Sequence, residues 1–197
     1  MLLVARHGEA DWNAEGRWQG QADRPLTERG REQAGVLAER IRGASIAAAY
    51  TSDLGRAYDT ATLALEGRQI PVTPLPGLRE RSFGSWDGLL DEEIPRRYPV
   101  QYATGSEVNR RVRSAPRPTR RSDRVTWTIE SLVAEHHQET VLVVTHSGPI
   151  AIVQAMALDL DFTDATQRRS LPELGNCELL SVATDGRFRL LDNDGGA

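Results

Sequence analysis

The sequence predicts an α/β sandwich built around a mostly parallel sheet. Apolar runs alternate with amphipathic stretches along most of the chain, and a tight-turn signal joins the last two apolar runs. The chain has 197 residues, of which 39% are hydrophobic and 26% are charged, so it is long enough for one substantial core and short for two. We therefore expect a single domain over residues 1–197.

The first half of the chain predicts three strands and two helices. In order, these are a strand at 1–5, a helix at 27–42, a strand at 46–51, a helix that ends near residue 66 and a strand at 70–74. Thr27 and Ser52 are placed to cap the two helices with their hydroxyl oxygens. Pro71 and Pro74 cannot donate backbone hydrogen bonds, so we expect the third strand at an edge of the sheet.

The second half predicts the clearest buried strand and a closing hairpin. Its elements are a short helix at 89–98, a helix at 122–137, a strand at 141–144, a helix that ends near residue 158 and strands at 177–183 and 188–191. Pro149 suits the first turn of the helix after the buried strand, where a missing N–H costs nothing. Asp185 and Gly186 lie between the last two strands and are typical of a hairpin turn.

Two segments lie outside this alternation. Residues 8–26 form a long polar loop, and long ordered loops are often functional. We interpret residues 99–125 as a lid or a variable insertion, because its second half is rich in arginine and reads either as a solvated loop or as a surface that faces an anion. The arginines concerned are Arg110, Arg111, Arg113, Arg117, Arg120, Arg121 and Arg124.

Composition argues against several classes of protein. The net charge of −4 is unlike that of a protein that binds nucleic acid through bulk charge. No apolar run reaches the ~18 residues of a membrane span, and the first residues do not resemble a signal peptide. We therefore expect a cytoplasmic protein that binds neither nucleic acid nor membrane. Cys177 is the only cysteine, which excludes an internal disulfide, and we interpret it as a small core residue.

The chain contains no lysine, so all 24 of its basic residues are arginine. This absence excludes Schiff-base chemistry and a P-loop lysine. An anion bound here must be held by arginine or by backbone N–H groups. Arginine suits phosphate in particular, because its planar fork donates two parallel hydrogen bonds.

Polar residues cluster where the predicted strands end. Arg6 and His7 follow the first strand, and His146 follows the buried strand. Arg56 lies in the helix after the second strand, and Glu80 comes shortly after the third. Ligands of open α/β sheets bind beyond the carboxyl ends of the strands, so these side chains could converge. Such a set can transfer a phosphoryl group without a metal, because imidazole attacks phosphorus, arginines neutralise its oxygens and a carboxylic acid protonates the leaving group.

The order of these motifs resembles the histidine phosphatase superfamily, which has a phosphoglycerate-mutase-like fold. An Arg-His-Gly tripeptide alone would be a weak signal, but the ordered blocks span residues 3–153 and are specific. The blocks are residues 6–9, 12–13, 16–17, 19–20, 23, 25–26, 30, 52–54, 56–57, 60–61, 78–80, 83–84, 86, 88, 146 and 148. The resemblance implies a three-layer α/β/α sandwich with no cofactor and no metal, and family members often form homodimers.

The resemblance also implies two sets of site residues. The catalytic set is His7, Glu80, His146, Arg6 and Arg56. The substrate-binding set is Asn13, Gln19, Gly20 and Ser147. In the family's mechanism, His7 would be phosphorylated, and Glu80 would protonate the leaving group and then activate water. For this proton donor, the residues themselves leave Glu9, Asp87, Glu92 and Glu93 open as alternatives.

The resemblance favours a phosphomonoesterase that acts on a small phosphorylated metabolite. A phosphoglycerate-type mutase is the alternative, and a non-catalytic protein that binds phosphorylated ligands is a third hypothesis. The chain lacks the longer insertion that the mutases carry, and mutases must exclude water. Many phosphatases of the family have a Gly-Gly-Glu-Ser-like segment where this chain has residues 118–122, so the identity of the substrate stays open.

Overall fold

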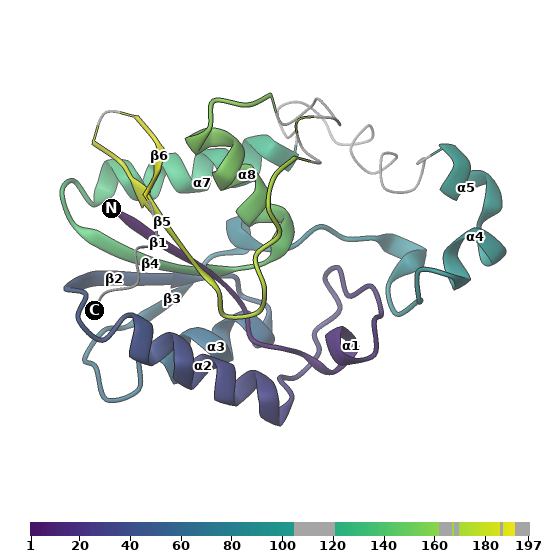
Figure 1. The fold of residues 1–197 in the computed structure, drawn as a ribbon, viewed down its shortest axis with the longest axis horizontal. Helices are drawn as coiled ribbons and strands as arrows, with labels where there is room; N and C mark the ends of the chain where they lie inside the picture. Colours follow the sequence, from purple (N-terminus) through teal and green to yellow (C-terminus); the bar gives the residue numbers. More distant parts are fainter. Residues whose placement is uncertain (105–120, 162–166, 168–169, 186, 192–197) are drawn as a thin grey trace.

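Six strands form one sheet in the order β3-β2-β4-β1-β5-β6 (Figure 1). The computed structural model describes residues 1–104, 121–161, 167, 170–185 and 187–191. The strands are β1 (Leu2–Arg6), β2 (Ile46–Thr51), β3 (Val72–Pro74), β4 (Thr140–Thr145), β5 (Leu179–Ala183) and β6 (Arg189–Leu191). Strands β3, β2, β4 and β1 pair in parallel, and β5 pairs with β1 and with β6 in antiparallel fashion. The mostly parallel sheet and the edge position of β3 are therefore confirmed.

Helices cover both faces of this sheet (Figure 1). Helices α2 (Glu28–Arg40) and α3 (Gly55–Ala64) lie on one face, and α7 (Arg121–Glu135) and α8 (Ser147–Ala157) lie on the other. The connections contain α1 (Asp11–Ala14), α4 (Glu93–Arg97), α5 (Pro99–Thr104) and the 3-10 turns η1 (Pro76–Leu78) and η2 (Gly84–Trp86). This arrangement confirms the three-layer sandwich. No helix among the described residues has the length and apolarity to span a membrane.

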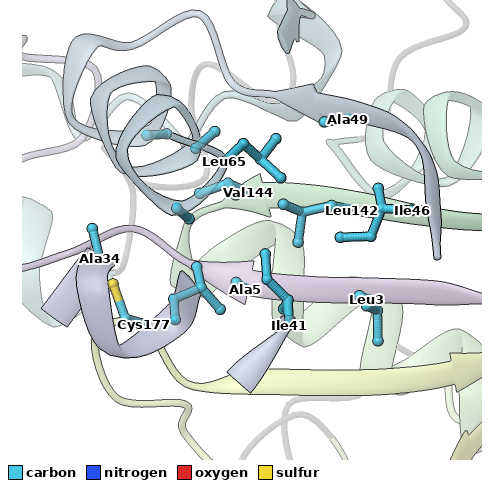
Figure 2. Packing of buried hydrophobic residues seen from close by; sticks show 14 residues of the cluster. Leu3, Ala5, Ala34, Ile41, Ile46, Ala49, Leu65, Leu142, Val144 and Cys177 are labelled. Atoms are coloured by element: carbon cyan, nitrogen blue, oxygen red, sulfur yellow. The ribbon is translucent and has the colours of Figure 1, made fainter. Parts of the chain in front are cut away.

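The central strand β4 contributes side chains to the hydrophobic clusters on both faces of the sheet. Its side chains alternate, so that Leu142 and Val144 pack towards α2 and α3 while Val141 and Val143 pack towards α7 and α8. A strand buried on both faces reads as a continuous apolar run, which is why it was the clearest strand in the sequence. Figure 2 shows the first of these clusters, which includes Cys177. Burial raises the pKa of this thiol to about 12, and its interpretation as a core residue is confirmed.

Four local predictions were wrong. Helix α3 begins at Gly55 with Leu54 at its N-cap, so Ser52 does not cap it, although its hydroxyl accepts from the Leu54 N–H at 3.3 Å. The loop at 8–26 contains the short helix α1. The helix expected at 89–98 begins only at residue 93, and β5 begins two residues after Cys177, which has a φ of 55°. Three of these errors concern the cap or the first residue of an element, and the fourth is a short helix that the sequence did not predict.

Two further predictions are confirmed, and two concern residues that lie wholly or mostly outside the described ones. Thr27 caps α2, since its side chain accepts from the Gly30 N–H, and Pro149 lies in the first turn of α8. Most of the lid or insertion expected at 99–125 falls outside the described residues. So does Gly186 of the expected hairpin turn, although the two strands that it joins are paired as predicted.

Two glycines let the end of β1 lie directly against the start of α2. A Cβ built on Gly8 would lie 2.4 Å from the carbonyl oxygen of Gly30. A Cβ built on Gly30 would lie 2.1 Å from the carbonyl oxygen of Glu9. Such distances do not occur between real atoms, so both positions need the absence of a side chain. The contact fixes the backbone that follows His7.

Gly30 and Gly35 lie in the same helix and provide a matched test of this contact. We expect Gly30→Ala to lower the free energy of unfolding by about 1–3 kcal/mol, because the new methyl group is forced against a carbonyl oxygen. Gly35 is exposed, with nothing within 4 Å of its Cβ position, so Gly35→Ala should raise the free energy of unfolding by about 0.5–1 kcal/mol. Urea unfolding of both variants measures the two changes. Equal stabilisation by both would contradict the close packing.

Candidate active site

His7 lies directly after β1, with its imidazole held in one tautomer. Its backbone N–H donates to the Thr145 carbonyl at 2.9 Å, and its carbonyl accepts from the Asn176 amide at 2.8 Å. The ring Nδ1 is 2.7 Å from the Gly8 carbonyl oxygen. A carbonyl can only accept, so Nδ1 carries the proton and Nε2 keeps its lone pair. This is the tautomer that a nucleophilic imidazole requires.

Arg56, in the first turn of α3, is the residue that faces this lone pair. Its Nε donates to Nε2 of His7 at 3.2 Å. Its two terminal nitrogens donate to the carbonyls of Gly20 and Ala22, both at 2.8 Å. Because a guanidinium carries five N–H groups, two remain beyond these three bonds for a bound anion. The same bonds hold the loop of residues 20–22 against the site.

His146 follows β4 as the N-cap of α8 and lies beside His7. The two ring centroids are 5.0 Å apart, with the rings inclined at 62°. Burial is the main cause that holds the pKa of both histidines well below the ordinary value. The positive charge of Arg56 acts on His7 in the same direction, and the neighbouring His7 and Arg56 act so on His146. Both rings are therefore neutral at pH 7 in the free protein.

Buried polar atoms without a partner occur on His146 and Arg6, which neighbour His7, and on Gln19, which precedes the glycine bonded to Arg56. The described residues contain six such side-chain atoms, and five of them belong to Arg6, Gln19 and His146. The sixth is the indole nitrogen of Trp86. A buried polar group without a hydrogen bond costs about 1–3 kcal/mol, so a cluster of them calls for a ligand. Arg6 also contributes charge, since it lowers the pKa of both histidines.

Glu80 lies on the irregular segment between η1 and η2, with its carboxylate at the start of α8. Its Oε1 accepts from the Arg81 N–H at 2.7 Å, and its Oε2 accepts from the Gly148 N–H at 2.9 Å. A Cβ on Gly148 would lie 2.3 Å from Oε1, so only glycine leaves room for this carboxylate. The Glu80 carboxylate therefore bonds to the backbone of Gly148, which lies two positions after His146 in the sequence.

Of the other carboxylates that the sequence left open, Asp87 lies near the site, since a Cβ on Gly20 would be 2.3 Å from its Oδ1 and its charge raises the pKa of Arg56. Glu9 accepts from the Thr27 hydroxyl at 2.8 Å. Glu93 accepts from the Leu90 N–H at 2.9 Å and pairs with Arg97 on α4. Asp87 accepts from the Phe83 N–H at 3.3 Å, and Glu92 is exposed at the N-cap of α4. Among these candidates, Glu80 is the one whose carboxylate meets the residues around His146.

The four residues expected to bind substrate differ in their burial and in their hydrogen bonds. Gln19 is buried with both amide atoms unpartnered, as a ligand-binding amide would be in the free protein. Gly20 adopts a φ of +51° and gives its carbonyl to Arg56, while Ser147 is exposed at the N-terminus of α8. Asn13 has a local role, because its side-chain oxygen accepts from the Ala10 N–H at 3.1 Å and closes the first turn of α1.

Sequence reasoning missed several residues that support the site. Thr60 accepts from the Gly8 N–H at 2.9 Å and donates to the Arg56 carbonyl at 2.7 Å, so it joins β1 to α3. Asp23 accepts from the Gly55 N–H at 2.8 Å and thereby caps α3 from a distant loop. Both positions belong to the motif blocks, but no local pattern indicates their partners. Among the described residues, no three His, Cys, Asp or Glu side chains are grouped to hold a metal ion.

Known proteins resemble this chain over most of its length. Phosphoserine phosphatase 1 of Hydrogenobacter thermophilus is 32% identical over 164 residues, which cover 82% of this chain and 78% of that protein. Phosphoglycerate mutase-like protein 4 of Arabidopsis thaliana is 32% identical over 199 residues, which cover 98% of this chain and 80% of that protein. The solved structure of YhfR from Bacillus stearothermophilus superposes with a TM-score of 0.83 at 32% identity, over 100% of this chain and 97% of that one.

A family model matches nearly the whole chain rather than single motifs. The model described as histidine phosphatase superfamily (branch 1) matches residues 2–192. That range contains every residue of the site and all six strands of the sheet. The chain therefore belongs to the histidine phosphatase superfamily and is an enzyme of its phosphatase type.

Proposed function

We propose that this protein hydrolyses small phosphate monoesters through a phosphohistidine formed on Nε2 of His7. One observation carries the proposal: unpartnered buried atoms of Arg6 and His146 belong to residues that neighbour His7, whose Nε2 keeps its lone pair. An oxyanion of the substrate would satisfy these atoms. In such a site the protein contributes positioning and charge, which are the main requirements of phosphoryl transfer.

The first half of the reaction transfers the phosphoryl group to the protein. The substrate displaces the Arg56 N–H from Nε2 of His7 and takes hydrogen bonds from Arg56, Arg6 and His146. Nε2 then attacks phosphorus, so that a P–N bond forms as the P–O bond to the alcohol breaks. Glu80, protonated in this complex, gives its proton to the departing oxygen.

The second half regenerates the free protein. Glu80, now a carboxylate, takes a proton from a water molecule that replaces the alcohol. The water oxygen attacks phosphorus as the P–N bond breaks, and inorganic phosphate leaves with His7 again neutral. The first amides of α8 favour the anion at both stages, because the helix N-terminus carries partial positive charge.

For the substrate, we propose a small phosphorylated metabolite. The name of the Hydrogenobacter relative supports phosphoserine as the first compound to test. The cytoplasmic location and the homodimer expected from the sequence stay predictions. A mutase is the second candidate, supported by the match to phosphoglycerate mutase-like protein 4 over 98% of the chain. Isomerisation of a phosphoglycerate that a bisphosphate accelerates would favour the mutase over the phosphatase.

Replacement of His7 tests the covalent step. We expect His7→Ala to lower p-nitrophenyl phosphate hydrolysis at least about 1,000-fold, because the variant lacks the ring nitrogen that the Gly8 carbonyl holds ready to attack phosphorus. Wild-type turnover should survive EDTA, and acid-labile phosphate should appear transiently on the wild type and never on the variant. His137→Ala, which changes an exposed histidine, is the matched control. Activity that EDTA abolishes and magnesium restores would contradict the mechanism.

The neutral histidines also predict how stability depends on pH. The pKa of His7 and of His146 is lower in the folded protein, so the unfolded chain binds more protons below about pH 6.5. The free energy of unfolding should therefore fall as the pH drops from 7 to 5, by about 1–2 kcal/mol for each histidine. Urea unfolding in a phosphate-free buffer measures this slope.

Carboxylates contribute to the same slope, so variants isolate the histidine contribution. His7→Asn and His146→Asn should each flatten the pH dependence, whereas His137→Asn should leave it unchanged. If all three variants keep the wild-type slope, the two site histidines are not held neutral by burial.

A further inference from the structure

The position of Glu80 depends on contacts made by the backbone around it. The segment from η1 to Glu80 has no sheet or long helix to hold it. Instead, side chains from elsewhere donate to its carbonyls: the Thr145 hydroxyl to Leu78 at 2.7 Å, and the Gln21 amide to Glu80 itself at 2.9 Å. The carboxylate is thus positioned by a framework of side chain to backbone bonds.

Arg124 supplies the two remaining bonds of this framework. Its Nη1 donates to the Pro76 carbonyl at 2.7 Å, and its Nη2 donates to the Arg79 carbonyl, the one directly before Glu80, at 2.6 Å. The planar fork fixes the distance and the angle between the two carbonyls, which a single flexible donor would not. Arg124 is the last of the seven arginines that the sequence singled out, and its side chain has this defined place in the structure.

Helix α7 is held close enough for Arg124 to make these bonds. A Cβ on Gly77 would lie 2.2 Å from the Thr128 hydroxyl oxygen, so η1 packs directly against α7 one turn after Arg124. The guanidinium is partly buried. Burial lowers the pKa of Arg124, and the negative charge of Glu80 opposes that effect. Arg124 therefore acts on Glu80 both through the backbone and through charge.

We propose that Arg124 is a positioning residue, which fixes the Glu80 carboxyl group for proton transfer through the carbonyls of Pro76 and Arg79. This inference rests on the proposed function, because it assigns Arg124 to the step in which Glu80 protonates the leaving group. A misplaced acid would harm substrates whose alcohol cannot leave as an anion. It would spare p-nitrophenyl phosphate, because p-nitrophenolate leaves without a proton.

The experiment compares kcat/KM for phosphoserine and for p-nitrophenyl phosphate, since for both esters kcat/KM covers substrate binding and the phosphorylation of His7 but not the later hydrolysis. We expect Arg124→Met to lower the value for phosphoserine about 10–100-fold and the value for p-nitrophenyl phosphate less than about 3-fold. The ratio of the two values does not depend on the fraction of folded protein. If Arg124→Met is insoluble, Arg124→Lys, which loses the fork, is read in the same way.

Arg68 offers a matched control. It donates to the carbonyls of Ile41 and Ala44 at 2.9 and 2.6 Å, so it makes the same kind of two-carbonyl bond away from the site. Arg68→Met should leave the ratio unchanged. In a Glu80→Gln background, Arg124→Met should no longer change the ratio, because its effect passes through the Glu80 carboxyl group.

Two outcomes would overturn the inference. An unchanged ratio, whether both values fall equally or neither falls, would show that Arg124 does not act on proton transfer. A ratio that Arg124→Met still changes in the Glu80→Gln background would show that it acts by another route. A wild type that hydrolyses neither ester would instead overturn the proposed function, and with it this assignment.

Discussion

The burial of Arg56 is the constraint on which the rest of the site depends. The side chain is 1% exposed, and its bonds among the described residues go to His7, Gly20 and Ala22. Burial lowers its pKa to about 10, so it remains a cation at neutral pH. Burying a charge without a bonded counterion costs free energy, and an anion bound in the pocket would offset that cost. Loop, helix and nucleophile are arranged about that one charge.

The sheet explains how distant residues reach this charge. Strands β1 and β4 are parallel neighbours, with Arg6 opposite Thr145. The residue after each strand is a histidine, so the register itself places His7 beside His146. Strand β2 lies on the other side of β4 and delivers α3 with Arg56 to the same edge. The carboxyl ends of parallel strands meet at one edge, so the sheet assembles the pocket from segments more than a hundred residues apart.

Much of this could be predicted from the sequence, because two kinds of signal are local. Apolar periodicity located all six strands and the four long helices, and the ordered polar motifs located Arg6, His7, Arg56, Glu80 and His146. Contacts between distant side chains and backbone left no such signal. Asp23 caps α3 from 32 residues away, and Arg124 reaches carbonyls more than 40 residues earlier. Asn13 makes a local capping bond that its motif position does not predict.

The burial of Cys177 has a consequence for the chemical resistance of the molecule. Sulfur is oxidised and alkylated mainly as the thiolate, and a buried thiol with a pKa of about 12 is almost entirely protonated at neutral pH. It is also the only cysteine in the chain. With a ring nitrogen as nucleophile, the proposed reaction needs no sulfur. Peroxide and thiol-alkylating reagents, which disable phosphatases that rely on a reactive cysteine, find no accessible thiolate here.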